Sequence, residues 1–342
     1  MQAMILEGIS SFAENPSPLV QAELPEPVPG AGEILIAVSA CGVCHTELDE
    51  VEGRTPPPAF PVIPGHQVVG TVAGRGPNAE RFRPGERVGV GWIHHACGLC
   101  AACRSGSENL CPSFRATGRD VHGGYAEFLT VPEAFAHPIP PVFSDSEAAP
   151  LLCAGAIGWR SLRLAGLNDG ETLGLAGFGA SAHLVLAAVR HRFPRARVFV
   201  FARSERERAF ARELGAAWAG TTDEAPPEPL RAVIDTTPAW KPALAALRHL
   251  APGGRLVINA IRKEEADKAE LLGLDYPAQL WREKEIKSVA NVTRSDIREF
   301  LEVAARIPLR PTVEEYPLAE ANRALAELKT GKLRGAKVLR MA

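Results

Sequence analysis

The sequence predicts two domains of different class, a β-rich domain followed by an α/β domain with a parallel sheet. At 342 residues the chain exceeds what one ordinary hydrophobic core encloses, so two domains are expected. Up to about residue 150, short runs of β-branched residues are separated by glycine and proline, a pattern typical of a small twisted barrel or sandwich. Beyond that point strand-like and helix-like segments alternate, as they do when helices cover both faces of a parallel sheet.

The composition is that of a globular protein with no bias towards polyanions. Hydrophobic residues make up 46% and charged residues 23%, and the net charge of −2 offers no general attraction for nucleic acid or acidic membranes. The N-terminus lacks the basic region and apolar run of a signal peptide, and no window approaches the roughly 20 apolar residues of a membrane span. We therefore expect a cytoplasmic protein whose seven cysteines form no disulfide framework. Metal ligation explains six of them better, four in one cluster and two spread apart, and leaves Cys41 over.

In the β-rich domain, strands are expected at 34–38, 68–72 and 87–90, where β-branched residues concentrate. The proline-rich stretch 55–64 cannot be the interior of a helix, so we expect a stiff loop that leads into His66.

Prolines between positions 138 and 150 mark the change to the α/β domain. From there the alternating pattern predicts strands at 173–176, 198–201, 232–235 and 255–261, and helices at 180–192, 205–214 and 242–250. From about residue 286 we expect one more strand and helices at 296–306 and 318–329.

Four cysteines in a short lobe, about residues 94–113, have the spacing of a structural zinc site. They follow the pattern C-x2-C-x2-C-x7-C, which lets successive thiolates turn back onto one tetrahedral ion. Four sulfurs leave no open coordination position, so this site predicts stability rather than chemistry; an iron–sulfur cluster or free thiols are the alternatives. The four residues are Cys97, Cys100, Cys103 and Cys111.

Three consecutive residues, Cys44, His45 and Thr46, have the side chains of a reaction site. A thiolate binds zinc, an imidazole can face an anion, and a hydroxyl can pass on a proton. One cysteine cannot hold a metal, and the best partners are His66, after a Pro-Gly turn, and Cys153, after the proline-rich connection. Two thiolates and one imidazole would leave a fourth position open, as in a catalytic zinc site; isolated packing residues are the alternative.

A glycine turn follows the first strand of the alternating region and opens a helix. It fits the pattern G-x-G-x-x-G/A as Gly177, Gly179 and Ala182, with Ala180 at the start of the helix. The pattern provides a tight turn, close approach to a pyrophosphate and a small residue where helix meets strand. Because the helix N-terminus also offers unpaired N–H groups, we expect a dinucleotide site here.

The end of the next strand bears on the choice between NAD and NADP. An NAD enzyme carries an acidic residue there for the adenosine ribose, whereas this chain has Ala202. With no carboxylate to repel a 2′-phosphate, and with Arg203 and Ser204 following, the sequence favours NADP(H) over NAD(H). Arg206 and Arg208 add positive charge, although a solvated helix face explains them equally well.

Together these motifs resemble the zinc-dependent alcohol dehydrogenases of the medium-chain dehydrogenase/reductase superfamily, in particular the bacterial propanol-preferring type. The resemblance covers nearly the whole chain and is carried by segments 42–46, 64–66 and 152–155, the lobe cysteines and the glycine turn. It implies a GroES-like β-barrel catalytic domain over 1–150, a Rossmann doubly wound parallel-sheet domain over 151–285, and a C-terminal segment, 286–342, that returns to the catalytic domain.

The resemblance also implies roles for individual residues. Cys44, His66 and Cys153 would be the ligands of a catalytic zinc, and Cys41 would not. The remaining assignments are Thr46 as acceptor of the alcohol proton, Asp49 at the end of the proton relay, His45 and Arg294 at the cofactor phosphates, and Thr46, Thr55 and Trp92 in the substrate pocket. For Arg294 an ordinary helix-start role is the alternative.

Three positions near the metal depart from the family pattern. Gln67 replaces a glutamate, which removes a negative charge and should make the metal more electrophilic. Glu47 replaces an aspartate, and Asp49 replaces a relay histidine, whose unperturbed pKa is ~6.5 against ~3.9 for aspartate. Thr55 stands where several short-alcohol enzymes carry tryptophan, which indicates a roomier pocket.

The implied function is reversible hydride transfer between a primary alcohol and NADP⁺ or NAD⁺, by a homodimer or homotetramer with two zinc ions per chain. This is an NAD(P)-dependent alcohol dehydrogenase, EC 1.1.1.-, with 1.1.1.1 and 1.1.1.2 as the candidate classes. Two alternatives remain: a zinc-free quinone or enoyl reductase of the same superfamily, which would lack the ligand set, and a non-enzymatic zinc-stabilised binding or sensor protein, which would oxidise no NADPH.

Overall fold

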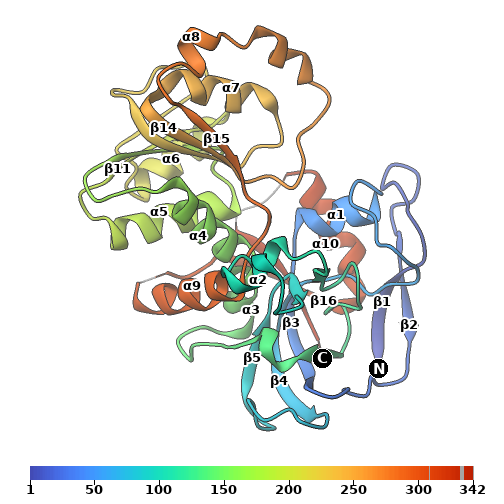
Figure 1. Ribbon diagram of the computed structural model, residues 1–342. Helices are drawn as coiled ribbons and strands as arrows, with labels where there is room; N and C mark the ends of the chain where they lie inside the picture. Colours follow the sequence, from blue (N-terminus) through green and yellow to red (C-terminus); the bar gives the residue numbers. More distant parts are fainter. Residues whose placement is uncertain (308, 332–334, 342) are drawn as a thin grey trace. The chain divides into compact units, whose positions relative to one another are not determined.

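The computed structural model describes residues 1–307, 309–331 and 335–341, and the chain divides into two compact units (Figure 1). The first unit contains Met1–Cys153 and the segment from Val292 onward, and the second contains Ala154–Asn291. Both chain termini are therefore in the first unit. The boundaries differ by a few residues from the expected ones, because Cys153 belongs to the first unit and the strand at 285–288 belongs to the sheet of the second.

The first unit is built on a seven-stranded sheet, counted over the described residues, in the order β16-β17-β3-β4-β5-β9, with β8 paired to β3. The C-terminal strand β17 pairs antiparallel with β3, so the end of the chain completes the sheet that the N-terminal part begins. The strands are β3 (Glu33–Val43), β4 (Gln67–Arg75), β5 (Arg87–Val90), β8 (Phe128–Pro132), β9 (Ala136–Pro138), β16 (Val313–Pro317) and β17 (Ala336–Arg340).

Two small strand pairs and several short helices complete this unit. The pairs are β1 (Gln2–Leu6) with β2 (Leu19–Glu23), and β6 (Ile93–His95) with β7 (Arg115–Ala116). The helices are α1 (His45–Val51), α2 (Ala101–Arg104), α3 (Asp145–Ala148), α9 (Arg294–Arg306) and α10 (Ala321–Lys329), with 3-10 turns η1 (Glu108–Leu110), η2 (Glu133–Phe135), η3 (Ala149–Leu152) and η5 (Leu318–Glu320).

Close packing of β3 on β4 depends on a glycine. A Cβ atom added at Gly70, in β4, would lie 2.2 Å from the carbonyl oxygen of Ala37, in β3. No side chain fits in that space, so Gly70 permits the contact that holds the two central strands together. At the other end of the pair Gly42 faces Gln67, which brings the residues after β3 close to the residues before β4.

The second unit is a six-stranded sheet whose neighbouring strands are all parallel. The order β12-β11-β10-β13-β14-β15 is 3-2-1-4-5-6 when the strands are numbered along the chain, the arrangement of a doubly wound dinucleotide-binding sheet. The strands are β10 (Thr172–Ala176), β11 (Arg197–Phe201), β12 (Trp218–Gly220), β13 (Leu230–Asp235), β14 (Leu250–Ile258) and β15 (Glu285–Ser288).

Helices follow the strands of this sheet as the alternating pattern predicts. They are α4 (Ala154–Ala165), α5 (Ala180–Arg192), α6 (Glu205–Glu213), α7 (Trp240–His249) and α8 (Tyr276–Gln279), with the 3-10 turn η4 (Lys268–Gly273). Every residue of β10 is buried, as expected for a central strand covered on both faces. None of the helices in the described part of the chain is long and apolar enough to cross a bilayer.

Candidate active site and metal centres

The structure brings Cys44, His66 and Cys153 together from three distant parts of the first unit. Their ligand atoms all lie within 4.8 Å of one another, and Nε2 of His66 is 3.2 Å from Sγ of Cys153. In a tetrahedral site with Zn–S ~2.3 Å and Zn–N ~2.0 Å, a sulfur and a nitrogen ligand are about 3.6 Å apart. The three side chains therefore fit a single zinc ion and leave one coordination position open.

Local structure explains how these ligands meet. Cys44 is the residue that precedes α1, just after β3, and His66 immediately precedes β4, which pairs with β3. Gly65 turns the chain into His66 with φ +97°, and a Cβ there would lie 2.4 Å from the Tyr125 ring. Cys153 follows η3, which contacts both β3 and β4.

One carboxylate, that of Glu47, holds two of the ligands. Its Oε2 accepts a hydrogen bond of 2.9 Å from the backbone N–H of Cys44, and its Oε1 lies 2.5 Å from Nδ1 of His66. The contact at Nδ1 leaves Nε2 of His66 for the metal. The family pattern has an aspartate at this position. Glu47 provides the same carboxylate on a side chain that is one methylene longer.

Neighbouring groups, acting against burial, favour the charged forms of Cys44 and His66, whereas Cys44 and burial raise the pKa of Cys153 and keep it a thiol. The neighbouring Cys153 lowers the pKa of Cys44 well below its usual value, against burial and with support from His66. Burial opposes a charged imidazole, yet Glu47 and Cys44 together raise the pKa of His66 well above its usual value. A thiolate at position 44 is the form that binds zinc.

A second carboxyl group, Glu50, is buried close to the ligands, and sequence reasoning missed it. It is three residues after Glu47 and so on the same face of α1. Glu50 is 1% exposed, and neither of its oxygens has a hydrogen-bond partner among the described residues. Burial and then the charge of Glu47 raise the pKa of Glu50 well above its usual value, with opposing contributions from His66 and Arg119. A carboxyl group therefore lies near the ligand set although position 67 carries glutamine.

The residues expected in the proton relay lie on α1 itself. Thr46 Oγ1 is 3.7 Å from Sγ of Cys44, and its side chain is half-buried, whereas His45 is exposed. Asp49 is 4% exposed and pairs with Nε of Arg54 at 2.5 Å.

Of the residues expected in the substrate pocket, Thr46 lies beside the metal ligand Cys44. Thr55 donates its backbone N–H to the carbonyl of Asp49 at 3.0 Å. Trp92 is buried against Phe114, with ring centroids 5.2 Å apart, and beneath the Arg119 guanidinium.

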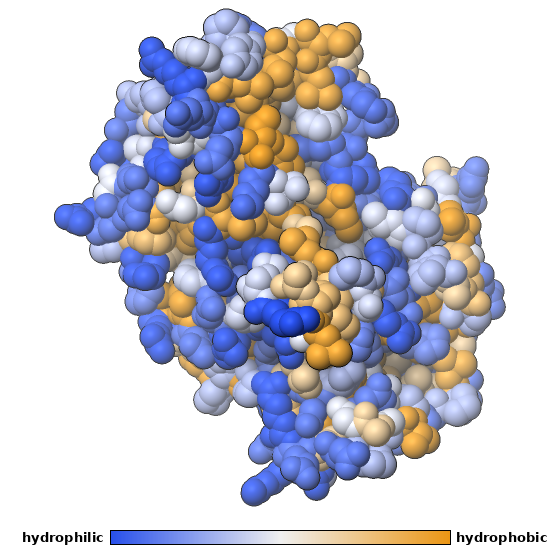
Figure 2. Space-filling model, viewed as in Figure 1, coloured by the Kyte–Doolittle hydropathy of each residue, from blue (hydrophilic) through white to orange (hydrophobic). Residues whose placement is uncertain are grey.

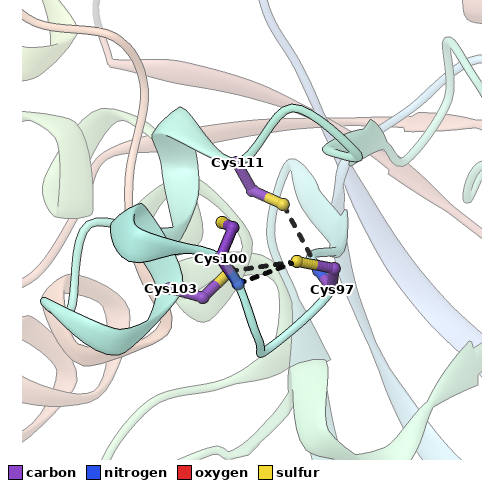
Figure 3. A group of neighbouring side chains, drawn as sticks. All are labelled: Cys97, Cys100, Cys103 and Cys111. Carbon is purple, nitrogen blue, oxygen red and sulfur yellow. Dashed lines mark hydrogen bonds between the residues drawn. The ribbon is translucent and has the colours of Figure 1, made fainter.

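The cysteine lobe forms a second ligand set, with its four side chains around a common centre (Figure 3). The four sulfurs lie within 4.8 Å of one another, and those of Cys97 and Cys103 are 3.9 Å apart, against about 3.8 Å for the edge of a Zn–S tetrahedron. The backbone N–H groups of Leu99 and Cys100 lower the pKa of Cys97 to about 6. This closed set fits a structural zinc.

In the second unit, the glycine turn has the geometry that its motif predicts. Gly177 has φ +82°, and Gly179 is exposed, with open space where a Cβ would stand, so a ligand can approach it closely. No side chain caps the N-terminus of α5 at Gly179, so the first N–H groups of the helix stay available for an anion. Ala182 is 0% exposed. The motif requires a small residue at this position, because the helix packs closely on the sheet there.

The residues that follow β11 include an arginine and a serine that the sequence assigned to the cofactor. Ala202 is buried, and Arg203 is exposed with no partner for its guanidinium among the described residues. Ser204 caps α6: its Oγ accepts the N–H of Glu207 and donates to the carboxylate of Glu207 at 2.8 Å. Arg294, the other expected phosphate ligand, belongs to the first unit, where its Nε donates to Glu108 at 2.9 Å and its guanidinium covers Phe135.

These two ligand sets and the 3-2-1-4-5-6 sheet define a class. The model of the alcohol dehydrogenase GroES-like domain matches residues 30–141, and the chain belongs to the zinc-dependent medium-chain alcohol dehydrogenases. It is similar to the protein named "Probable alcohol dehydrogenase AdhA" from Mycobacterium tuberculosis, with 46% identity over 331 residues that cover 95% of this chain and 93% of that one. An alcohol dehydrogenase from Geobacillus stearothermophilus is 31% identical over 330 residues, 93% of this chain and 94% of that one.

Solved structures give the same result. The cobalt- and zinc-bound thermostable alcohol dehydrogenase from Pyrobaculum aerophilum matches with a TM-score of 0.83 and 25% identity over 99% of both chains. The predicted fold, a GroES-like domain with a Rossmann sheet, is confirmed. So is the enzyme class: the chain is an NAD(P)-dependent alcohol dehydrogenase, EC 1.1.1.-, with one structural and one catalytic zinc site.

Proposed function

We propose that this enzyme interconverts a primary alcohol and its aldehyde with a preference for NADP(H). The observation that carries the reaction is the convergence of Cys44, His66 and Cys153 with the Thr46 hydroxyl beside them. A single test is to screen primary alcohols of increasing length with NADP⁺ and NAD⁺. Turnover with none of them would contradict the proposal, and the bacterial propanol-preferring type predicts the highest kcat/KM with short chains.

In this mechanism the chain's own residues bind the metal, position the substrate and move a proton. Bound zinc would supply Lewis acidity that lowers the pKa of an alcohol oxygen, and a bound nicotinamide would supply the hydride acceptor. Thr46 takes the alcohol proton, because its hydroxyl lies next to a metal ligand. Asp49, three residues further along α1, receives it next, and Arg54 holds the Asp49 carboxylate in place. Thr55 and Trp92 line the alcohol pocket.

The cofactor is held at several places in this proposal. The N–H groups around Gly179 and Ala180 bind the pyrophosphate, with Gly177 and Ala182 shaping the turn, and His45 contributes an exposed imidazole. Arg294 is the weakest member of the set, because Glu108 and Phe135 already bind its guanidinium.

The preference for NADP(H) rests on Ala202 and Arg203. No carboxylate follows β11 directly, and the exposed guanidinium of Arg203 can pair with a 2′-phosphate. Ser204 can help only if its hydroxyl leaves Glu207. Arg203→Ala should weaken NADPH binding about tenfold, the equivalent of one charge-assisted hydrogen bond, and leave NADH binding unchanged. The neighbouring Arg206→Ala is the control, and wild-type protein that binds NADH as tightly as NADPH would refute the preference.

A homodimer formed through β15 is part of the proposal. β15 ends the described sheet, all four of its residues are exposed, and Ile286 is 51% exposed. The chain segment that leads into β15 exposes three more apolar side chains, Leu272 (92% exposed), Tyr276 (57%) and Trp281 (59%). Figure 2 shows apolar side chains gathered on the surface of the second unit.

The sequence of β15 suits pairing with a second copy. In an antiparallel pair centred on Ile286, Glu285 of each copy faces Lys287 of the other, so the charges are complementary. Ile286→Lys should halve the mass measured by light scattering, whereas Val28→Lys, at another exposed apolar residue (88% exposed), should not. Unchanged mass in Ile286→Lys would contradict this interface. The expected cytoplasmic location also belongs to the proposal, since none of the seven cysteines forms a disulfide.

A further inference from the structure

The carboxyl ends of β10 and β13 form the point in the sheet where the strand order reverses. Ala176 and Asp235 are paired across these two neighbouring parallel strands. After β10 the chain enters the glycine turn, and after β13 it enters the segment 236–239, so the two turns lie side by side. Ligands of doubly wound sheets bind in the crevice at this place.

The segment after β13 packs directly against the glycine turn. The N–H and hydroxyl of Thr236 donate to the carbonyl of Ala176 at 2.9 and 3.0 Å. A Cβ added at Gly177 would lie 2.8 Å from Oγ1 of Thr236 and 3.0 Å from Cγ2 of Thr237. Any shift of Thr236 or Thr237 would therefore be transmitted to the turn that approaches the pyrophosphate.

A buried lysine, Lys263, fixes this segment. Its ammonium forms an ion pair with Asp235 and donates to the carbonyls of Thr237 and Ala239 at 2.9 and 2.8 Å, so all three of its N–H bonds have acceptors. Asp235 is 0% exposed, and its other oxygen accepts the N–H and the hydroxyl of Thr237 at 3.0 and 2.7 Å. The side chain of Lys263 is 8% exposed and lies over the ring of Trp240.

The residues around Lys263 add backbone contacts to the same segment. The N–H of Glu264 donates to the carbonyl of Pro238 at 2.8 Å, and the carboxylate of Asp267 accepts the N–H groups of Trp240 and Lys241 at 2.8 and 2.9 Å. The stretch that follows β14 thus clamps the stretch that follows β13. A buried ion pair of this kind is a poor source of stability compared with apolar packing, but it specifies one geometry.

We propose that Lys263 is a positioning residue for the dinucleotide: with Asp235 it holds Thr236 and Thr237 against the glycine turn, and thereby fixes the shape of the cofactor site before the cofactor binds. Lys263 need not touch the cofactor. NADPH and NADH have the same pyrophosphate, which would bind at the glycine turn. Lys263 therefore affects the affinity for both cofactors alike. This inference rests on the assignment of the glycine turn as the pyrophosphate site.

The main test removes both charges at once, because Lys263→Met alone would leave the buried Asp235 charge without its partner. In the double variant Lys263→Met/Asp235→Asn, the Kd values for NADPH and NADH, measured by fluorescence well below the unfolding temperature, should each rise about tenfold or more. Zinc content should stay at two per chain. The matched control is Lys241→Met/Asp223→Asn, which removes an ion pair whose side chains are 52% and 72% exposed, and which should leave both Kd values unchanged.

A folded double variant with the Kd values of the wild type would overturn the proposal. A wild-type protein that binds neither dinucleotide would instead refute the cofactor site itself, so the two failures are distinguishable. If the double variant does not fold, hydrogen exchange on the intact wild type decides. The hydrogen-bonded amides of this segment should be as protected without cofactor as those of β13; they are the amides of Thr236, Thr237, Trp240 and Lys241. Protection that develops only when NADPH is added would refute a clamp formed in advance.

Discussion

The charge of Glu47 should govern how tightly the catalytic zinc is held. Glu47→Gln keeps the shape of the side chain but removes the negative charge that faces Nδ1 of His66 at 2.5 Å. A single amide oxygen must then serve either His66 or the N–H of Cys44, which now donates to Oε2 at 2.9 Å. Losing such a partner of a metal-binding histidine typically weakens metal affinity ten- to hundredfold, which corresponds to about 1.4–2.7 kcal/mol.

The assay is competition with a chromogenic chelator, in which the catalytic zinc of Glu47→Gln should be released at ten- to hundredfold lower chelator concentration than in the wild type. The zinc of the cysteine lobe serves as the internal reference, since no residue of that lobe changes. Glu47→Asp should lie between the two, because it keeps the charge but is one methylene shorter. Glu52→Gln is the control: Glu52 binds Arg54 and Lys329, so its loss should lower stability without releasing zinc. Glu47→Gln with wild-type zinc affinity would refute this reasoning.

Three further predictions concern the lobe, acid stability and the proton relay. Cys97→Ser should lose the lobe zinc and lower the Tm, with little change in kcat for the fraction that stays folded; a wild-type Tm would argue against a structural zinc. Burial lowers the pKa of His137 to about 3 and that of His94 to about 4, with help from nearby arginines. Because the unfolded chain protonates these histidines near pH ~6.5, stability should fall as the pH drops from 6.5 towards 4, by about 1.4 kcal/mol per pH unit and histidine. Denaturant titrations of His137→Gln should show a shallower fall, and an equal slope would contradict the assignment. Asp49→Asn should lower kcat for alcohol oxidation and alter its pH profile, whereas an unchanged profile would remove Asp49 from the relay.

The metal ligands were predictable because short sequence motifs identify them. The lobe cysteines have a spacing that few other functions need, and Cys44 and His66 lie in short motifs next to strands. The glycine turn was predictable for the same reason, since its strand-turn-helix context is contiguous. In each case a few neighbouring residues carry the signal, and the fold only has to bring the segments together.

Glu50 and Lys263 could not be predicted, because their importance depends on contacts between distant segments. The helix α1 has no apolar period that would predict it, so nothing in the sequence placed Glu50 on the face of Glu47. Lys263 lies 28 residues after Asp235, in a stretch with no motif of its own.

Some element boundaries also differed from the prediction, for physical reasons. A helix was expected at 242–250 and a strand at 255–261, but β14 already begins at Leu250, because Leu250 pairs with Leu230 of β13. The three-residue strand β12 is too short to show a period, and pairing with β11 alone defines it. The expected helix at 318–329 begins with the 3-10 turn η5 and continues as α10.

The central claim is that three scattered side chains hold one zinc ion on which alcohol oxidation depends. Its most direct test is the zinc content of the wild type and of Cys44→Ser, measured together with alcohol turnover and Tm. We predict two zinc ions per chain in the wild type, and one in Cys44→Ser with a Tm close to that of the wild type and no turnover. A Cys44→Ser enzyme that keeps both ions and oxidises alcohols at the wild-type rate would contradict the account.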